Sequence, residues 1–188
     1  MLEKIAGKVV ARWLDKGVIE EEDKEVYEYG MVLSLEYLAS IVTTAFIALI
    51  TKEIFTCMIF YICFANLRSY TGGFHAKTFV RCYLYSTGII LVSVLMIKFD
   101  MIVIMYYRVL GMMSFIYIVI MDPIVHENRE VTEKEKKIFS RCKNKNVLVI
   151  VSAIVISAGF RFFKFEKSME SAMIAVVICC ILARRKIR

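Results

Sequence analysis

The sequence predicts an all-α, polytopic integral membrane protein with about six transmembrane or re-entrant helices and an amphipathic interfacial helix at the N-terminus. Composition is the first reason: 59% of the 188 residues are hydrophobic, mean hydropathy is +0.64 and there is one proline, which is too apolar for an ordinary soluble domain. The second reason is that the apolar residues form long runs separated by short charged turns. We therefore expect residues 1–188 to form a single domain embedded in the lipid bilayer.

Residues 1–28 carry charge throughout, which excludes a secretory signal with an unbroken apolar stretch. Apolar residues recur there at helical spacing, while lysines and arginines occupy the other positions. The apolar set is Leu2, Ile5, Val9, Val10, Trp13 and Leu14. This pattern predicts an amphipathic helix lying on the membrane surface.

Six apolar segments follow, and two longer polar segments interrupt them. The apolar segments are residues 31–50, 54–67, 82–97, 101–121, 147–163 and 168–183, and the polar segments are 68–81 and 122–146. The first is long enough to cross the hydrocarbon core and contains one charged residue, Glu36. The second is short, so it predicts either a span or a re-entrant hairpin.

The distribution of positive charge predicts the orientation. The formal net charge is +7, but the basic residues lie between apolar runs instead of on one continuous face, which favours membrane topology over nucleic-acid binding. With six spans, 19 of the 25 lysines and arginines fall on the side of both termini and of segments 68–81 and 122–146. That side is therefore expected to be cytoplasmic, where cysteines remain reduced.

Segment 68–81 and the start of the next span contain the residues best suited to catalysis. His75 follows the pair Gly72 and Gly73, and Cys82 comes seven residues later beside Arg81. A histidine that removes a thiol proton and pairs with the thiolate is the smallest set able to transfer an acyl group. Cysteine is also a common small apolar residue in helices, so a structural role for Cys82 is the alternative.

The motif Arg-x-x-x-Gly-Gly-x-His-Ala, followed by a cysteine seven residues after the histidine, resembles the accessory gene regulator B (AgrB) family of bacterial membrane peptidases. The matching positions are Arg68, Gly72, Gly73, His75, Ala76 and Cys82. The resemblance implies an endopeptidase that removes the C-terminal tail of a small amphipathic, AgrD-like precursor peptide. It also implies help in closing that peptide into a thiolactone for quorum sensing, and a homodimer in the plasma membrane.

On this reading His75 is the general base and Cys82 the nucleophile, while Arg68 binds a substrate carboxylate and Gly72–Gly73 let the substrate chain approach closely. The residue that orients His75 stays open among Asn66, Ser69, Glu36 and Asp122. In one straight helix, residues 75 and 82 would stand about 10.5 Å apart along the axis. We therefore expect irregular backbone near 72–79, a His75 that folds back, or a pair completed across a dimer.

A second function class is a small membrane transporter or assembly factor. Glu36, Arg108 and His75 would then line a polar path and Cys82 would be structural. Most of the six cysteines lie in apolar runs and are expected to be reduced structural thiols. No Cys-x-x-Cys motif or histidine cluster predicts a metal, and no cofactor is expected.

Overall fold

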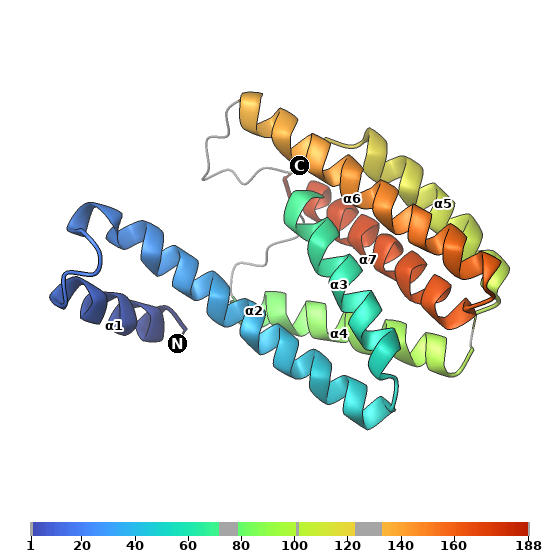
Figure 1. The fold of residues 1–188 in the computed structure, drawn as a ribbon, viewed down its shortest axis with the longest axis horizontal. Helices are drawn as coiled ribbons and strands as arrows, with labels where there is room; N and C mark the ends of the chain where they lie inside the picture. The colour runs from blue at the N-terminus through green and yellow to red at the C-terminus, as the bar shows by residue number, and fades with distance from the viewer. Residues whose placement is uncertain (1, 72–78, 101, 123–132, 188) are drawn as a thin grey trace. The chain divides into compact units, whose positions relative to one another are not determined.

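The computed structural model describes residues 2–71, 79–100, 102–122 and 133–187, and in these ranges the chain is helical (Figure 1). The helices are α1 (Leu2–Asp15), the 3-10 helix η1 (Glu21–Asp23), α2 (Lys24–Thr51), α3 (Ile54–Thr71), α4 (Phe79–Lys98), α5 (Ile104–Ile120), α6 (Glu133–Gly159) and α7 (Phe163–Ile187). The chain forms two compact units, Met1–Thr43 and Thr44–Arg188, and α2 belongs partly to each.

In the first unit, α1 packs against the beginning of α2. Ala6 and Val10 lie one helical turn apart and are fully buried, and the ring of Trp13 meets that of Tyr27 edge-on at 6.4 Å. The chain reverses at Gly17, whose φ of +66° suits glycine, with hydrogen bonds from Gly17 N to Leu14 O and from Val18 N to Trp13 O. The expected amphipathic helix is present, although Ile5 of the predicted apolar set is exposed.

In the second unit, α7 is the central helix and contacts α3, α4, α5 and α6 (Figure 1). Every residue from Glu166 to Met173 is buried, so this part of α7 is covered on all sides. The apolar core around it is well packed, and its largest fully buried members include Phe60, Leu67, Ile90, Ile118 and Met173. The helix with the most buried polar residues thus lies at the centre of the bundle.

Among the described residues, three helical stretches are long and apolar enough to cross a membrane: Glu21–Thr51, Ile54–Thr71 and Lys134–Gly159. Tyr83–Lys98 and Ile104–Ile120 are shorter apolar helices. The second of the three resolves the ambiguity about segment 54–67, because α3 continues to Thr71 and its 18 residues reach about 27 Å. The protein is an all-α, polytopic membrane protein.

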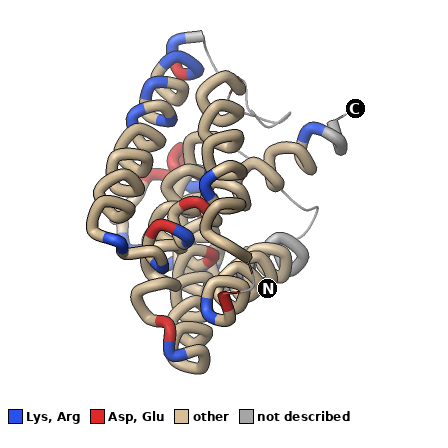
Figure 2. The backbone as a smooth tube through the Cα atoms, turned by 90° about the vertical axis from the view of Figure 1, so that its right-hand side faces the viewer, with Lys and Arg blue, Asp and Glu red and all other residues tan. Residues whose placement is uncertain are grey.

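Helix α6 begins earlier than its apolar run. The polar segment 122–146 contains the first 14 residues of α6, from Glu133, and its lysines and arginines gather in this first half (Figure 2). One of these lysines, Lys143, is buried instead of lying at the surface as its charge would suggest. It is 1% exposed, and its Nζ donates hydrogen bonds to the carbonyl oxygens of Met121 and Val119, which satisfies the C-terminal end of α5.

Three short connections lie at one end of this unit, called here the turn end: residues 52–53, 99–103 and 160–162. Each described reversal places a charged, non-glycine residue in the left-handed region, with φ of 57° at Lys52, 49° at Asp100 and 59° at Arg161. Backbone hydrogen bonds such as Phe162 N to Ser157 O close the reversals and satisfy carbonyl groups of the preceding helix.

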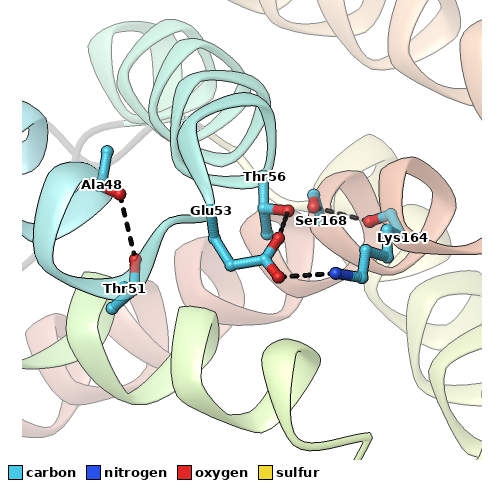
Figure 3. Close-up of polar contacts among 6 residues, drawn as sticks. All are labelled: Ala48, Thr51, Glu53, Thr56, Lys164 and Ser168. Carbon is cyan, nitrogen blue, oxygen red and sulfur yellow. Dashed lines mark hydrogen bonds and ion pairs between the residues drawn. The ribbon is translucent and has the colours of Figure 1, made fainter.

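Two lysines at the start of α7 form ion pairs with the connections at residues 52–53 and 99–103. Lys164 Nζ donates to Glu53 Oε1 at 2.5 Å, and Thr56 Oγ1 donates to Glu53 Oε2 at 2.7 Å (Figure 3). Lys167 is 6% exposed, and its Nζ donates to Asp100 Oδ1 and, at 3.1 Å, to Ile102 O. These contacts bring the turns before α3, α5 and α7 to the same end of the bundle.

The Glu53 contacts predict a stability loss in acid. Burial raises the pKa of this carboxyl, but the hydrogen bonds from Lys164 and Thr56 outweigh burial and lower the pKa below its ordinary value of 4.5. A carboxyl with a lowered pKa contributes stability above the unfolded-state pKa, and that contribution is lost as pH falls through the folded-state pKa. We expect the melting temperature of the wild type to exceed that of Glu53→Gln at pH 7, with the gap closing below about pH 4.5.

A thermal-unfolding series in detergent from pH 7 to pH 3 measures this gap. Lys164→Met, which removes the ion pair but keeps Glu53, should reproduce most of the loss at pH 7. A gap between wild type and Glu53→Gln that stays constant over the whole series would contradict the assignment.

Candidate functional site

The end opposite the turns, called here the site end, carries the residues singled out in the sequence. It comprises the last turn of α3, the first turns of α4 and α6, the end of α5 and the end of α7. Gly72, Gly73 and His75 lie outside the described residues. The predicted irregular backbone near 72–79 and the geometry of the His75–Cys82 pair therefore stay predictions. The structure describes the helices on both sides of this segment.

Arg68 lies in the last turn of α3 and reaches across to α4. Its Nη1 donates a hydrogen bond to Ser86 Oγ at 3.0 Å, and its guanidinium carbon lies 5.6 Å from the centre of the Phe64 ring one turn earlier. Phe64 is 3% exposed and belongs to the core, so the ring against which the cation lies is held in place by packing. The positive charge of Arg68 is thus held at the α3–α4 junction, close to the beginning of α4.

Cys82 is the fourth residue of α4, and the structure describes its backbone but not its side chain. Ser86, the partner of Arg68, lies four residues further along α4, so residues 82 and 86 share one face of the helix. Sequence analysis did not single out Ser86. The one feature that could have pointed to it is its spacing of four residues from Cys82.

The four residues proposed to orient His75 lie in different settings. Asn66 Nδ2 donates to Ile62 O at 2.9 Å and Ser69 Oγ donates to Ala65 O at 2.8 Å, so both side chains bond to the backbone of their own helix. Asp122 is exposed at the end of α5, and Glu36 belongs to the first unit. Of the four, Asn66, Ser69 and Asp122 lie at the site end.

An open hollow of about 560 Å³ lies beside the end of α5. Its walls are mostly apolar, with a carboxylate and a guanidinium at the rim; they are Met113, Ile116, Tyr117, Ile120, Met121, Asp122 and Arg184. Arg184 of α7 lies over the Tyr117 ring, 5.9 Å from its centre. The hollow could hold an apolar side chain next to a charged group, as a peptide entering from the membrane surface would present.

The buried cysteines of the bundle are a second set of thiols. Cys57, Cys63, Cys179 and Cys180 are thiols buried in the core, and Cys142 is a half-buried thiol; none of the five forms a disulfide. Cys180 is hydrogen-bonded with Thr71, the last residue of α3, and so links α7 to the end of α3.

The turn end holds a charged cluster that the sequence did not predict. Arg108 of α5 makes a two-pronged pair with Glu166 of α7, with Nε to Oε1 at 2.6 Å and Nη2 to Oε2 at 3.3 Å. The transporter hypothesis instead groups Arg108 with Glu36 and His75 along a polar path. One turn further along α7, Glu170 is 3% exposed and its Oε2 has no hydrogen-bond partner among the described residues. Gly111 makes room for it, since a Cβ there would lie 3.0 Å from Glu170 Cγ.

Within the part of the chain that the structure describes, no three or more His, Cys, Asp or Glu side chains gather where they could hold a metal ion. The described residues of the site end supply a held guanidinium, that of Arg68, and the apolar hollow beside α5.

Comparison with known proteins agrees with the fold. The family model described as AgrB, accessory gene regulator B, matches residues 2–183, which is essentially the whole chain. No curated protein and no solved structure gave a significant match. The family is one of quorum-sensing peptide processing, with a precursor peptide as the substrate at the membrane. The chain belongs to the accessory gene regulator B family.

Proposed function

We propose that this protein is a membrane cysteine endopeptidase and acyl transferase that uses Cys82 and His75 to cut a precursor peptide. The observation that carries the proposal is the position of Cys82 on α4, one turn before Ser86, whose Oγ accepts a hydrogen bond from Arg68. A guanidinium held on that face of the helix would favour the thiolate of Cys82 over the thiol.

The proposed reaction has two steps. His75 takes the proton of Cys82, and the thiolate attacks the carbonyl carbon of the scissile peptide bond. The C–N bond then breaks, and His75 returns the proton to the departing amine of the C-terminal tail. The thioester on Cys82 is next attacked by a cysteine thiolate of the same precursor, which forms the ring thiolactone and regenerates the Cys82 thiolate.

Exclusion of water decides whether the second step succeeds. Exchange of one thioester for another is close to even in free energy, whereas hydrolysis would destroy the activated bond irreversibly. The site therefore needs to hold the precursor cysteine in place and to be shielded from bulk water. The hollow lined by Met113, Ile116 and Tyr117 supports the first of these needs, since its apolar walls beside Asp122 and Arg184 could hold part of the peptide in place.

The proposal places the site end and both termini in the cytoplasm, and it includes a homodimer in the plasma membrane. The distribution of lysines and arginines supports the orientation, because only five of them fall in or beside the connections at the turn end while 19 are expected on the opposite side. A pair completed between two copies is also one of the ways in which His75 and Cys82 could meet.

Site-resolved mass spectrometry tests the proposal. Full-length protein in liposomes is mixed with a synthetic peptide that has an amphipathic leader, an internal cysteine and an acidic tail. The expected result is release of the tail together with a transient acyl adduct on the fragment that contains Cys82, and none on the fragment with the half-buried Cys142. Tail release with the adduct on another cysteine, or with no adduct under rapid acid quench, would overturn the assignment of Cys82.

A further inference from the structure

Ser86 is a polar residue of α4 that no motif includes, and its contact connects two parts of the proposed site. Its Oγ accepts the hydrogen bond from Arg68 Nη1 at 3.0 Å, and its side chain is half-buried between α3 and α4. Residues 82 and 86 are one turn apart, about 6 Å along the helix axis. The face of α4 that receives Arg68 is therefore also the face on which Cys82 lies.

Two described contacts hold the guanidinium of Arg68. The Phe64 ring lies against it from within α3, and Ser86 of α4 accepts its hydrogen bond. Ser86 lies on the helix that carries Cys82. An arginine side chain has many rotamers, so a hydrogen bond at its tip restricts where its charge lies.

On the basis of the proposed cysteine-peptidase function, we propose that Ser86 is a positioning residue that holds the Arg68 guanidinium beside the first turn of α4, where its charge stabilises the Cys82 thiolate. The cation acts on the thiol and Ser86 acts through the cation. Two further charges at this end, Arg184 of α7 and the neighbouring Arg81, remain when Ser86 is changed. Loss of the Ser86 hydroxyl should therefore reduce thiolate formation without abolishing it.

The test measures thiol reactivity and needs no peptide substrate. Full-length protein in detergent micelles is treated with iodoacetamide between pH 5 and pH 9, and the alkylated fraction of Cys82 is read by peptide mass spectrometry. We expect Ser86→Ala to lower the Cys82 alkylation rate at pH 7 roughly three- to tenfold and to move half-maximal reactivity to higher pH, since a thiol that loses a nearby cation ionises later.

Two further serine variants separate positioning from a structural effect. Ser86→Thr keeps a hydroxyl at the same place and should restore the wild-type profile. Ser93→Ala is the matched control, because Ser93 is also half-buried on α4 but lies two turns beyond Ser86. It should leave the profile unchanged. A shift of equal size in Ser93→Ala, or no rescue by Ser86→Thr, would overturn the positioning role.

A double-mutant cycle makes the result independent of small folding losses. Arg68→Gln should shift the profile at least as far as Ser86→Ala. Adding Ser86→Ala to Arg68→Gln should produce no further shift, because Ser86 acts only by positioning the charge that Arg68→Gln removes. Additive shifts would overturn the inference. The outcome is separable from the proposed function: if no acyl adduct forms on Cys82, the peptidase proposal fails, whereas an adduct with an unshifted Ser86→Ala profile contradicts this inference alone.

Discussion

Replacing Cys82 with alanine is expected to lower the rate of precursor cleavage by roughly 10⁴-fold or more, because no other group can form the thioester. His75→Ala should cost a factor of roughly 10² to 10⁴, since the thiol would then have to lose its proton without a positioned base. The measurement is the initial rate of tail release from a synthetic precursor in liposomes, followed by mass spectrometry.

The double variant is the sharper result. When two groups act as one unit, removing both costs about as much as removing one. Cys82→Ala together with His75→Ala should therefore be no slower than Cys82→Ala alone. Cys142→Ala, which changes another thiol outside the buried core, is the matched control and should cleave at nearly the wild-type rate. If Cys82→Ser processes the peptide as well as the wild type does, the protein is not a thiol peptidase, and a transporter or assembly factor becomes the better hypothesis.

Arg108→Ala is expected to destabilise the bundle by about 1 to 3 kcal/mol, because it leaves a buried carboxylate without its partner. Glu166 is 1% exposed and takes two charged hydrogen bonds from Arg108, whose own side chain is 45% exposed. Glu170, one turn further along α7, is a second buried carboxyl next to this pair. Equilibrium unfolding in mixed micelles measures the change in the free energy of unfolding.

The matched control and the rescue come from the same chain. Arg141→Ala removes an exposed arginine of α6 and should change the free energy of unfolding by less than about 1 kcal/mol. Arg108→Met combined with Glu166→Leu replaces the pair with apolar groups and should recover most of the stability. A loss in Arg108→Ala no larger than in Arg141→Ala would show that the pair does not support the α5–α7 contact.

Apolar runs predicted the presence of the helices well. They marked where the chain leaves the apolar interior, which is not always where a helix begins or ends. The run at 101–121 corresponds to α5 at Ile104–Ile120, whereas the run at 147–163 corresponds to a helix that already begins at Glu133. Lysines are good helix formers and can continue a helix outside the hydrocarbon, so hydropathy does not detect that first half. Helix α6 continues without a break from the polar segment into the apolar run.

Pairing between distant helices was beyond what the sequence could predict. The motif containing Arg68, His75 and Cys82 predicts a site between α3 and α4, and the structure shows Arg68 hydrogen-bonded to α4, the helix of Cys82. The partner of Arg108 depends on which face of α7 meets α5, and the buried amine of Lys143 depends on where α5 ends. Both contacts are set by packing between segments that are far apart in the chain. The local sequence pattern carries no information about that packing.

The three left-handed reversals at Lys52, Asp100 and Arg161 bear on how the chain enters the bilayer. Each joins two helices through two to five residues, so each pair can insert as one helical hairpin with its tip leading. On the proposed orientation, a charged residue at the tip crosses the hydrocarbon once, and its cost there opposes a return crossing. Glycine would make the reversal easier by roughly 1 to 2 kcal/mol but would not oppose the return. On that orientation, each charged tip would therefore keep its hairpin from reversing after insertion.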